Sequence, residues 1–392
     1  MSRPHLFALS VIALLLVNGL AAAETGTPDV SEDPAKPKLD FYGYLKLDAA
    51  FDTALVDTGN FARWVESPDV FESHSHFNLT ARQTRLGLRF TGRRTERFRL
   101  AGKVEIDFYG GGDENKNRLQ MRHGFVELTW PQRGHSVIAG QTSDLISPLV
   151  PSTINYTVAW WVGNIGYRRP QVRFTHRATN ASGSGFVAAV AATRTIGDDF
   201  GLEPGDSGAD SGVPSIQGRV GYGWKQGDDR KAELGLWGHW GEEHLHRDVS
   251  PVDAKLDSWS LGFDLKLPLG ERVTLQAEGW TGANLDDYFG GIGQGINFDS
   301  LEEIESAGGW VAVDFKPQDD LTLSLGAGID DPDDEDLEGG SRSKNVAVWG
   351  NMVYSILPEL ALGIELSYWD TDYNTFASGD AGRLQTALIY RF

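Results

Sequence analysis

The chain has 392 residues, a formal net charge of −20 and no cysteine. This length fits two or three soluble domains or one large barrel, and composition alone does not choose between them. The lack of cysteine excludes thiol chemistry and cysteine-ligated metal sites.

The N-terminus has the features of a secretory signal. Arg3 supplies a positive charge, residues 6–20 form a short apolar run, and small residues at 21–23 precede Glu24. This order predicts a cleaved signal peptide over residues 1–23 and a mature chain that begins near Glu24. An N-terminal membrane anchor is the alternative, but the run is short for the roughly 20 residues that a spanning helix needs.

No second apolar stretch of spanning length follows. A membrane protein with this sequence must therefore cross with strands, because only helices and closed barrels satisfy their backbone polar groups in lipid. Residues 24–40 contain three prolines without periodicity and are expected to form a flexible N-terminal segment. From Phe41 onward apolar and polar residues alternate with a period of two, which is typical of a strand with one apolar face.

Sixteen such strands can be read from residue 41 to residue 392. Many of them approach the roughly 9 to 11 residues that a tilted strand needs to cross a bilayer. The sequence therefore predicts an all-β fold, a 16-stranded antiparallel transmembrane β-barrel over residues 41–392. The expected strands cover residues 41–52, 77–91, 97–109, 118–130, 135–142, 170–178, 185–195, 214–224, 230–240, 256–267, 272–283, 306–316, 320–329, 343–355, 359–370 and 382–392.

The connections between these strands alternate between long and short. Long loops follow the odd-numbered strands and short turns follow the even-numbered ones, as in a barrel with long external loops and short periplasmic turns. The periplasmic ends of the even strands should then carry an aromatic girdle. The aromatic residues at these ends are Phe90, Trp130, Trp224, Phe315, Tyr354, Tyr390 and Phe392.

The last strand is apolar up to Phe392, and its apolar face is expected to meet lipid while the strand pairs with the first one to close the barrel. A terminal aromatic with Tyr390 two residues before it resembles the C-terminal assembly signal of Gram-negative outer-membrane barrels. The resemblance implies that Leu388, Tyr390 and Phe392 are recognised by the barrel assembly machinery.

Five further segments carry a resemblance to a known family: GYLKLDAAF (43–51), LTARQTRLGLRF (79–90), LQMRHGFVEL (119–128), AGQTSD (139–144) and RRPQVRF (168–174). With the terminal signal, they resemble the Gram-negative porins, most closely the DcaP-like trimeric porins, over nearly the whole mature chain. The resemblance implies a homotrimer in the outer membrane, in contact with lipid and lipopolysaccharide, without a cofactor. Those porins often carry an N-terminal coiled coil, whereas residues 24–40 contain no heptads.

The connection over residues 143–169 is the longest one and is unusually apolar. In porins the loop after the fifth strand folds into the lumen and sets the constriction, and the same infolded third loop is expected here. A loop of this composition packs inside a barrel more readily than it hangs in water. A loop that contacts a neighbouring subunit is the alternative. The apolar residues are Leu145, Ile146, Leu149, Val150, Trp160, Trp161 and Ile165.

The phase of the strands places many charged residues inside the barrel. In the second strand the apolar phase changes between Ala81 and Leu86, so a β-bulge near Gln83 would turn the neighbouring arginines inward. An arginine that faced lipid would cost roughly 2 to 4 kcal/mol at the bilayer midplane. The predicted basic pore lining is Arg82, Arg85, Arg89, Arg99, Lys103, Arg118, Arg122, Arg168, Arg169 and Arg173. The predicted acidic lining is Asp107, Glu127, Glu233, Glu278 and Glu365.

This lining predicts a porin for the passive diffusion of small hydrophilic solutes, with a preference for small anionic solutes or carboxylate-bearing molecules, which guanidinium groups bind in bidentate fashion. Opposed basic and acidic walls would also set a transverse field that orients dipolar solutes. Structural neutralisation of the arginines by acids such as Asp107 and Glu127 is the alternative. The acidic runs at 299–305 and 330–338 are expected in external loops, as candidates for binding divalent cations next to lipopolysaccharide.

Two remaining motifs are not expected to carry chemistry. HWGEEHLH at 239–246 gathers three histidines, but on a strand end rather than on the helix that a zinc protease needs, so no metal site is predicted. GGIGQG at 290–295 lacks the strand-to-helix setting of a phosphate loop and is expected to be a tight external turn. No catalytic residue, cofactor or nucleic-acid partner is predicted. An outer-membrane barrel enzyme and a non-conducting adhesin or structural barrel are the alternative functions.

Overall fold

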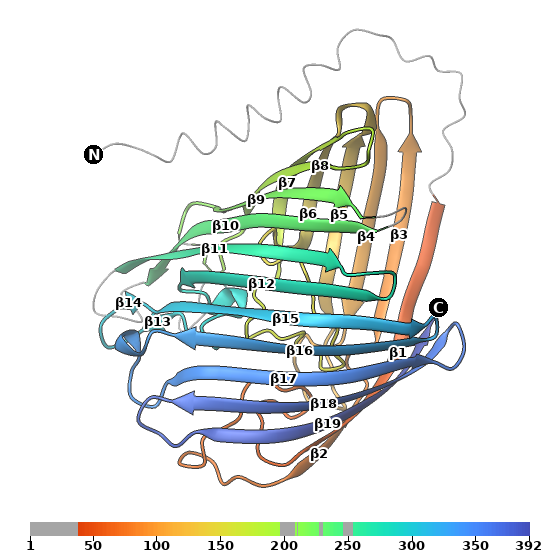
Figure 1. The fold of residues 1–392 in the computed structure, drawn as a ribbon. Coiled ribbons are helices and arrows are strands. Elements are labelled where there is room, and N and C mark those ends of the chain that lie inside the picture. Colours follow the sequence, from red (N-terminus) through yellow and green to blue (C-terminus); the bar gives the residue numbers. More distant parts are fainter. Residues whose placement is uncertain (1–37, 197–207, 210, 227–229, 246–253) are drawn as a thin grey trace, which may run out of the picture.

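The computed structural model describes residues 38–196, 208–209, 211–226, 230–245 and 254–392. Within them one antiparallel sheet closes on itself (Figure 1): β1 (Lys38–Asp52) pairs with β19 (Gly379–Arg391) on one side and with β2 (His76–Thr80) and β3 (Arg85–Arg94) on the other. β2 and β3 are two halves of one barrel strand, so the described chain forms the predicted 16-stranded barrel. The other barrel strands are β4 (Arg99–Asp107), β5 (Gln120–Trp130), β6 (His135–Ser143), β7 (Arg168–Thr179), β8 (Gly185–Thr193), β9 (Ser215–Lys225), β10 (Lys231–Leu245), β11 (Ala254–Pro268), β12 (Val273–Ala283), β15 (Glu305–Gln318), β16 (Leu321–Pro332), β17 (Arg342–Ser355) and β18 (Leu360–Tyr373).

The predicted signal peptide and residues 24–37 lie outside the described residues. β1 begins at Lys38 rather than at Phe41, so residues 38–40 belong to the first strand instead of the N-terminal segment. β10 continues to Leu245, beyond the predicted end at residue 240.

The break between β2 and β3 is the predicted bulge. β1 pairs with both halves, at Asp48 with Thr80 and at Tyr44 with Arg85. Three residues of β1 therefore face the four residues 81–84 of the other strand, which adds one residue to that strand and reverses its phase.

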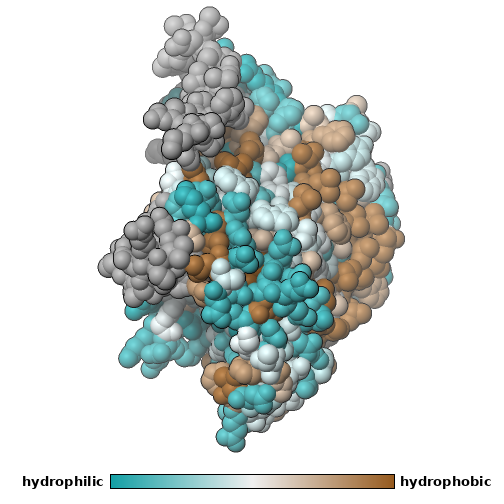
Figure 2. All heavy atoms as spheres, turned by 90° about the vertical axis from the view of Figure 1, so that its left-hand side faces the viewer, coloured by the Kyte–Doolittle hydropathy of each residue, from teal (hydrophilic) through white to brown (hydrophobic). Residues whose placement is uncertain are grey.

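The barrel carries its apolar side chains outward. Along β1, Leu39, Phe41, Leu45 and Leu47 are exposed, whereas Lys46, Asp48 and Asp52 in the opposite phase are buried inside. Figure 2 looks onto the side at the left of Figure 1, where the hairpin of β13 (Ile296–Asn297) and β14 (Glu302–Glu303) lies. Hydrophilic residues gather over the centre of that face, and hydrophobic residues form a broad band on the outer wall at the right.

Helical structure in the described residues is limited to three short 3-10 turns, η1 (Pro131–Arg133), η2 (Asp286–Tyr288) and η3 (Asp334–Asp336). None of the helices found there is long and apolar enough to cross a membrane.

The terminal strand closes the ring as the sequence predicts. Leu388, Tyr390 and Phe392 are 46%, 47% and 40% exposed on the outer face. Phe392 and Gly43 exchange two backbone hydrogen bonds of 3.1 Å, and the Phe392 ring stacks on Phe41 with centroids 5.2 Å apart. The last residue is therefore held by both its backbone and its side chain.

Candidate functional site

One carboxylate organises the predicted basic pore lining. Glu105 of β4 forms ion pairs with Lys103 at 2.9 Å and with Arg122 at 3.2 Å, and Arg85 lies 3.6 Å away. Arg122 also reaches Asp107 at 2.6 Å. Both carboxylates are buried inside the barrel. The structure thus brings three predicted cations from three strands around two acids, which leaves a surplus of positive charge.

A tyrosine lies beside this cluster. Tyr42 is directly opposite Gly87 of β3, where a Cβ atom would come within 2.3 Å of Tyr42 Cζ. The Tyr42 hydroxyl donates to Glu105 at 2.7 Å, and the guanidinium carbon of Arg89 lies 3.8 Å from the centre of the ring. Glycine at position 87 therefore leaves the space that the ring occupies between the cations.

Three further arginines of the predicted lining lie over tyrosine rings. The distances from guanidinium carbon to ring centre are 5.3 Å for Arg82 and Tyr109, 5.2 Å for Arg85 and Tyr44, and 4.3 Å for Arg168 and Tyr167. In the described part of the chain, Arg82, Arg89 and Arg168 have no carboxylate partner, and Nε and Nη2 of buried Arg168 have no hydrogen-bond partner. We call the inward faces of β3 to β7, with these residues, the basic wall.

The other four predicted basic residues have different positions. Arg99 is exposed at the start of β4, and Arg173 donates to Gln171 at 2.9 Å and to a backbone carbonyl. Arg118 precedes β5 and is exposed in the connection before it, so its predicted position in the barrel wall is wrong. Arg169 is wrong as a pore-lining residue, because it is fully buried in an ion pair with Asp144 at 3.2 Å.

The third loop folds inside the barrel, as predicted, and spans residues 144–167 because Arg168 and Arg169 already belong to β7. Leu145, Ile146, Trp160, Trp161 and Ile165 are each at most 8% exposed, although Val150 is 56% exposed. The loop packs against the inner face of strands on the far side of the ring. Its apolar composition therefore reflects burial within its own barrel.

Two predicted acidic pore residues hold this loop instead of lining a path. Glu278 of β12 accepts hydrogen bonds from the backbone N–H of Leu149 at 2.8 Å, from the Ser147 hydroxyl, and from Trp310 Nε1 at 3.0 Å. Buried carboxylates are stabilised by such donors, and the Leu149 N–H group would lack an acceptor without Glu278. The loop thus covers the carboxylate that the sequence assigns to the pore.

Glu365 of β18 has the same role further along the loop. It accepts from the backbone N–H groups of Ile154 at 2.6 Å and Asn155 at 3.2 Å, and from the Asn351 side chain at 3.1 Å. Glu233, the third predicted acid on this side, pairs with Arg219 at 2.6 Å. Glu278 and Glu365 are therefore covered by the loop and wrong as pore-lining residues, whereas Glu233 is 43% exposed and shares Arg219 with Asp264.

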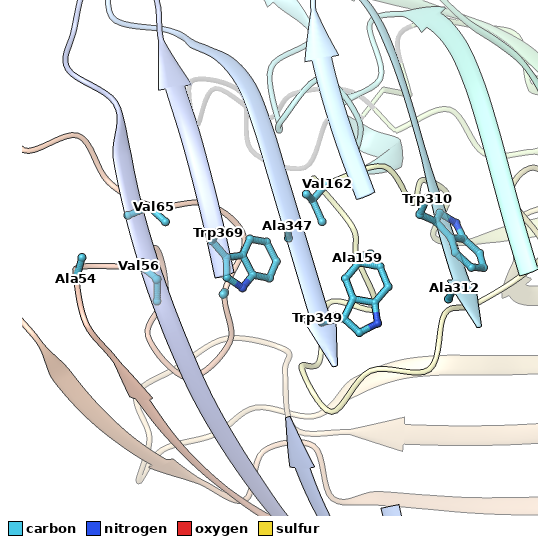
Figure 3. Packing of buried hydrophobic residues seen from close by; sticks show 12 residues of the cluster. Ala54, Val56, Val65, Ala159, Val162, Trp310, Ala312, Ala347, Trp349 and Trp369 are labelled. Atoms are coloured by element: carbon cyan, nitrogen blue, oxygen red, sulfur yellow. The ribbon is translucent and has the colours of Figure 1, made fainter. Parts of the chain in front are cut away.

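The inner face on this side is formed by tryptophans. Figure 3 shows Trp310, Trp349 and Trp369 on three strands, in one cluster with Ala159 and Val162 of the third loop. Several lie over a glycine directly opposite on the next strand, where a Cβ would be 2.3 Å from the ring for Gly262 and Gly326 and 2.5 Å for Gly308. We call this face, on β10 to β18, the tryptophan wall; its members are Trp237, Trp280, Trp310, Trp349 and Trp369.

The third loop also reaches the basic wall through Tyr156. Its hydroxyl lies 3.4 Å from Asp107 and from Arg122, and its ring stacks on Tyr109 with centroids 3.9 Å apart. Burial, with a smaller contribution from Asp107, raises the pKa of Tyr156 to about 12. Tyr156 is therefore a neutral hydrogen-bond donor at physiological pH, and it adds no negative charge beside the arginines.

In the two motifs for which no chemistry is predicted, the described residues make separate structural contacts. His239 is buried between Ser260 and Ser258, at 2.6 and 3.1 Å, whereas His244 contacts Glu242 at 2.7 Å; His246 lies outside the described residues. The segment 290–295 is a turn, but it packs inward rather than outward. Its Ile292 is fully buried in a cluster with aromatic residues of the third loop.

Sequence reasoning missed the tryptophan wall. The signal was present, because Trp349 and Trp369 alternate with the outward residues Val348, Leu366 and Tyr368. A tryptophan in the inward phase of a barrel strand requires an apolar partner inside, and only an infolded loop can supply one.

Comparisons with known proteins agree with this fold. The family model of the DcaP outer membrane protein matches residues 15–193. The crystal structure of the outer membrane channel DcaP of Acinetobacter baumannii superimposes with a TM-score of 0.75 at 20% identity, over 92% of this chain and 99% of that one. An anion-selective porin from Comamonas acidovorans gives a TM-score of 0.56 at 14% identity, over 91% and 100%. OmpT of Vibrio cholerae, in a form without loop L8, gives 0.56 at 13%, over 91% and 99%.

No curated protein matches the chain. All three structural likenesses are below 25% identity, so they support the barrel fold rather than a solute. The family match over residues 15–193 and the shared barrel together confirm the resemblance to the DcaP outer membrane proteins that the sequence predicts.

Proposed function

We propose that this protein is a porin of the Gram-negative outer membrane, through which small hydrophilic solutes diffuse passively, with a preference for anions or carboxylate-bearing molecules. A barrel of this strand number encloses an aqueous path. The single observation that carries the anion preference is the unbalanced charge of the basic wall. Arg85, Lys103 and Arg122 share Glu105, and Arg122 takes Asp107 as well.

The tryptophan wall supports the same preference. Its acids Glu278 and Glu365 donate no free charge to the path, because the third loop occupies them. Of the three predicted acids on these strands, only Glu233 has an exposed side chain, and it pairs with Arg219. A guanidinium group in such a setting attracts anions and binds carboxylates through two parallel hydrogen bonds. The anion selectivity of the Comamonas acidovorans relative is consistent with this proposal.

The remaining parts of the proposal concern assembly. We infer export through a cleaved signal peptide, insertion by the barrel assembly machinery through the terminal strand, and a homotrimer surrounded by lipid and lipopolysaccharide. One structural relative, OmpT of Vibrio cholerae, has a trimer form. The outward apolar surface of β1 and β19 supports the lipid contact.

A planar-bilayer recording tests the function. The purified protein is inserted, and the reversal potential is measured across a KCl gradient for the wild type, for Arg85→Gln and for Arg97→Gln. Arg97 is exposed in the turn before β4 and serves as the control. We expect stepwise ohmic conductance, an anion-selective potential, and a loss of selectivity in Arg85→Gln only. Cation selectivity would contradict the charge assignment, and a folded barrel without conductance would favour the enzyme or adhesin alternatives.

A further inference from the structure

Two groups of arginines inside this barrel differ in the side chains that they contact. Members of the first group form ion pairs with carboxylates at 3.2 Å or less: Arg122, Arg169, Arg219 and Arg383. Members of the second group lie over tyrosine rings and have either no carboxylate partner in the described chain or, for Arg85, one at 3.6 Å: Arg82, Arg85, Arg89 and Arg168. Arg169 also lies over Tyr288, at 3.7 Å.

The two kinds of partner have different electrostatic consequences. A carboxylate cancels the charge of the arginine that it holds. A tyrosine face attracts a cation through its quadrupole, worth roughly 0.5 to 1 kcal/mol at exposed sites, and leaves the net charge unchanged. An arginine stacked on a ring is therefore fixed in place and stays electrostatically available to an ion in the lumen.

From this difference we infer that Tyr42 and Tyr44 are positioning residues for anion preference, which hold Arg89 and Arg85 as unneutralised cations on the basic wall. This inference rests on the proposed function and deepens it. Both tyrosines come from the inward phase of β1, and β3 supplies both arginines. Gly87 is part of the arrangement, because the Tyr42 ring fills the space that a side chain there would take.

The Tyr42 hydroxyl also helps to keep the cations unneutralised, through its contact with Glu105. It occupies Oε2 of Glu105 at 2.7 Å, the oxygen that Lys103 also approaches at 2.9 Å. A neutral donor on this oxygen competes with the cations for Glu105. Tyr42 thus supports one arginine with its ring and limits the neutralisation of the others with its hydroxyl.

Few acids lie near these arginines. Asp40 lies directly opposite Arg89 in the β1–β3 register, but its carboxylate pairs with Lys38 at 2.8 Å. Glu105 is shared by Arg85, Lys103 and Arg122. Removal of a tyrosine ring would free the arginine above it to swing toward one of these carboxylates.

The test compares side chains that keep or lose the ring without changing any charge. The chloride-to-potassium permeability ratio is derived from the reversal potential in a KCl gradient for the wild type, Tyr42→Leu/Tyr44→Leu and Tyr42→Phe/Tyr44→Phe. We expect the leucine pair to lower the ratio roughly two- to fivefold, the factor that corresponds to a cation–π interaction of this size. The phenylalanine pair should retain at least most of the wild-type ratio, because it keeps both rings.

An unchanged ratio in the leucine pair would overturn the inference, and so would an equal fall in the phenylalanine pair. Gly87→Ala is the second variant, because it displaces the Tyr42 ring without removing any tyrosine or charge; the same direction of change is expected. Folding of each variant is checked by its heat-modifiable mobility in SDS gels. If the wild type itself shows no anion preference, the proposed function fails first, which separates the two results.

Discussion

The basic wall and the tryptophan wall occupy the same inward phase of the same barrel and use it in opposite ways. On the basic wall, Arg85 and Arg89 rest on tyrosines beside the lumen. On the tryptophan wall, Trp310 and Trp349 pack against the third loop, and Glu278 holds its backbone. Inward phase alone therefore does not define a pore lining. What matters is whether an infolded loop covers the side chain.

The largest effect is expected when an anchor of the third loop is removed. Glu365→Ala leaves the N–H groups of Ile154 and Asn155 without their acceptor, and each unsatisfied buried donor costs roughly 1 to 3 kcal/mol. We expect a lower urea midpoint when unfolding in detergent is measured by tryptophan fluorescence. We also expect noisier channel currents. Glu127→Ala on the basic wall is the control. Equal, small effects of both changes would show that the loop does not depend on its anchor.

A methyl group added at a glycine tests the packing of each wall. In Gly326→Ala the new Cβ would lie 2.3 Å from Trp349, which the third loop confines; overpacking of this kind costs roughly 1 to 3 kcal/mol. Gly87→Ala should lower the free energy of unfolding by less, because Tyr42 borders the lumen and can move. Gly270, in an open turn with no neighbour within 4 Å, gives the control variant. The same unfolding measurement ranks the three, and a reversed order would mean that the tryptophan wall is the looser one.

Neutralising one acid on each wall tests whether the two walls differ in their effect on ion selectivity. Glu105→Gln should raise the chloride-to-potassium permeability ratio about two- to threefold, as expected for one elementary charge several ångströms from the ion path in water. Glu278→Gln should leave the ratio unchanged, because the third loop covers this carboxylate. The reversal potentials of the two variants in a KCl gradient give these ratios. A shift in Glu278→Gln as large as that in Glu105→Gln would contradict the assignment of the walls.

The smallest effect is expected in the first external loop. Burial, then the nearby charge of Asp57, raises the pKa of Glu66, which accepts a hydrogen bond from Trp64 at 3.2 Å. The folded state therefore binds the proton more tightly than the unfolded state, and stability falls as the pH rises from the ordinary glutamate pKa through the raised one. Because Glu66 is partly exposed, the change should stay below about 1 kcal/mol. Unfolding of the wild type and Glu66→Gln between pH 4 and 7 measures this pH dependence of stability. The variant should lack the part that comes from Glu66.

The strands of this fold could be predicted because lipid restricts which side chains can face outward. An outward arginine is too costly and an outward leucine is favourable, so the phase of Leu86, Leu88 and Arg89 is visible in one strand. Even the bulge near Gln83 follows from the change of phase. These are local patterns, and a single sequence contains them.

The partners of the charged side chains could not be predicted in this way. Glu278 meets Ser147 across 131 residues, and Glu365 meets Ile154 across 211. No period of two links such positions. The same limit applies to Arg169, whose inward phase is right but whose charge is matched by Asp144 at the base of the loop.

The closure of the ring between β1 and β19 has a kinetic consequence. The buried ion pair of Asp52 with Arg383 joins residues 331 positions apart, and it can form only when the two edges of the sheet meet. Contacts of such high sequence separation form slowly, although the loop-closure entropy rises only weakly with length. Until that step the sheet exposes two unpaired edges, which are prone to pair with other chains. The last strand should therefore govern how fast this barrel matures and how often it aggregates on the way.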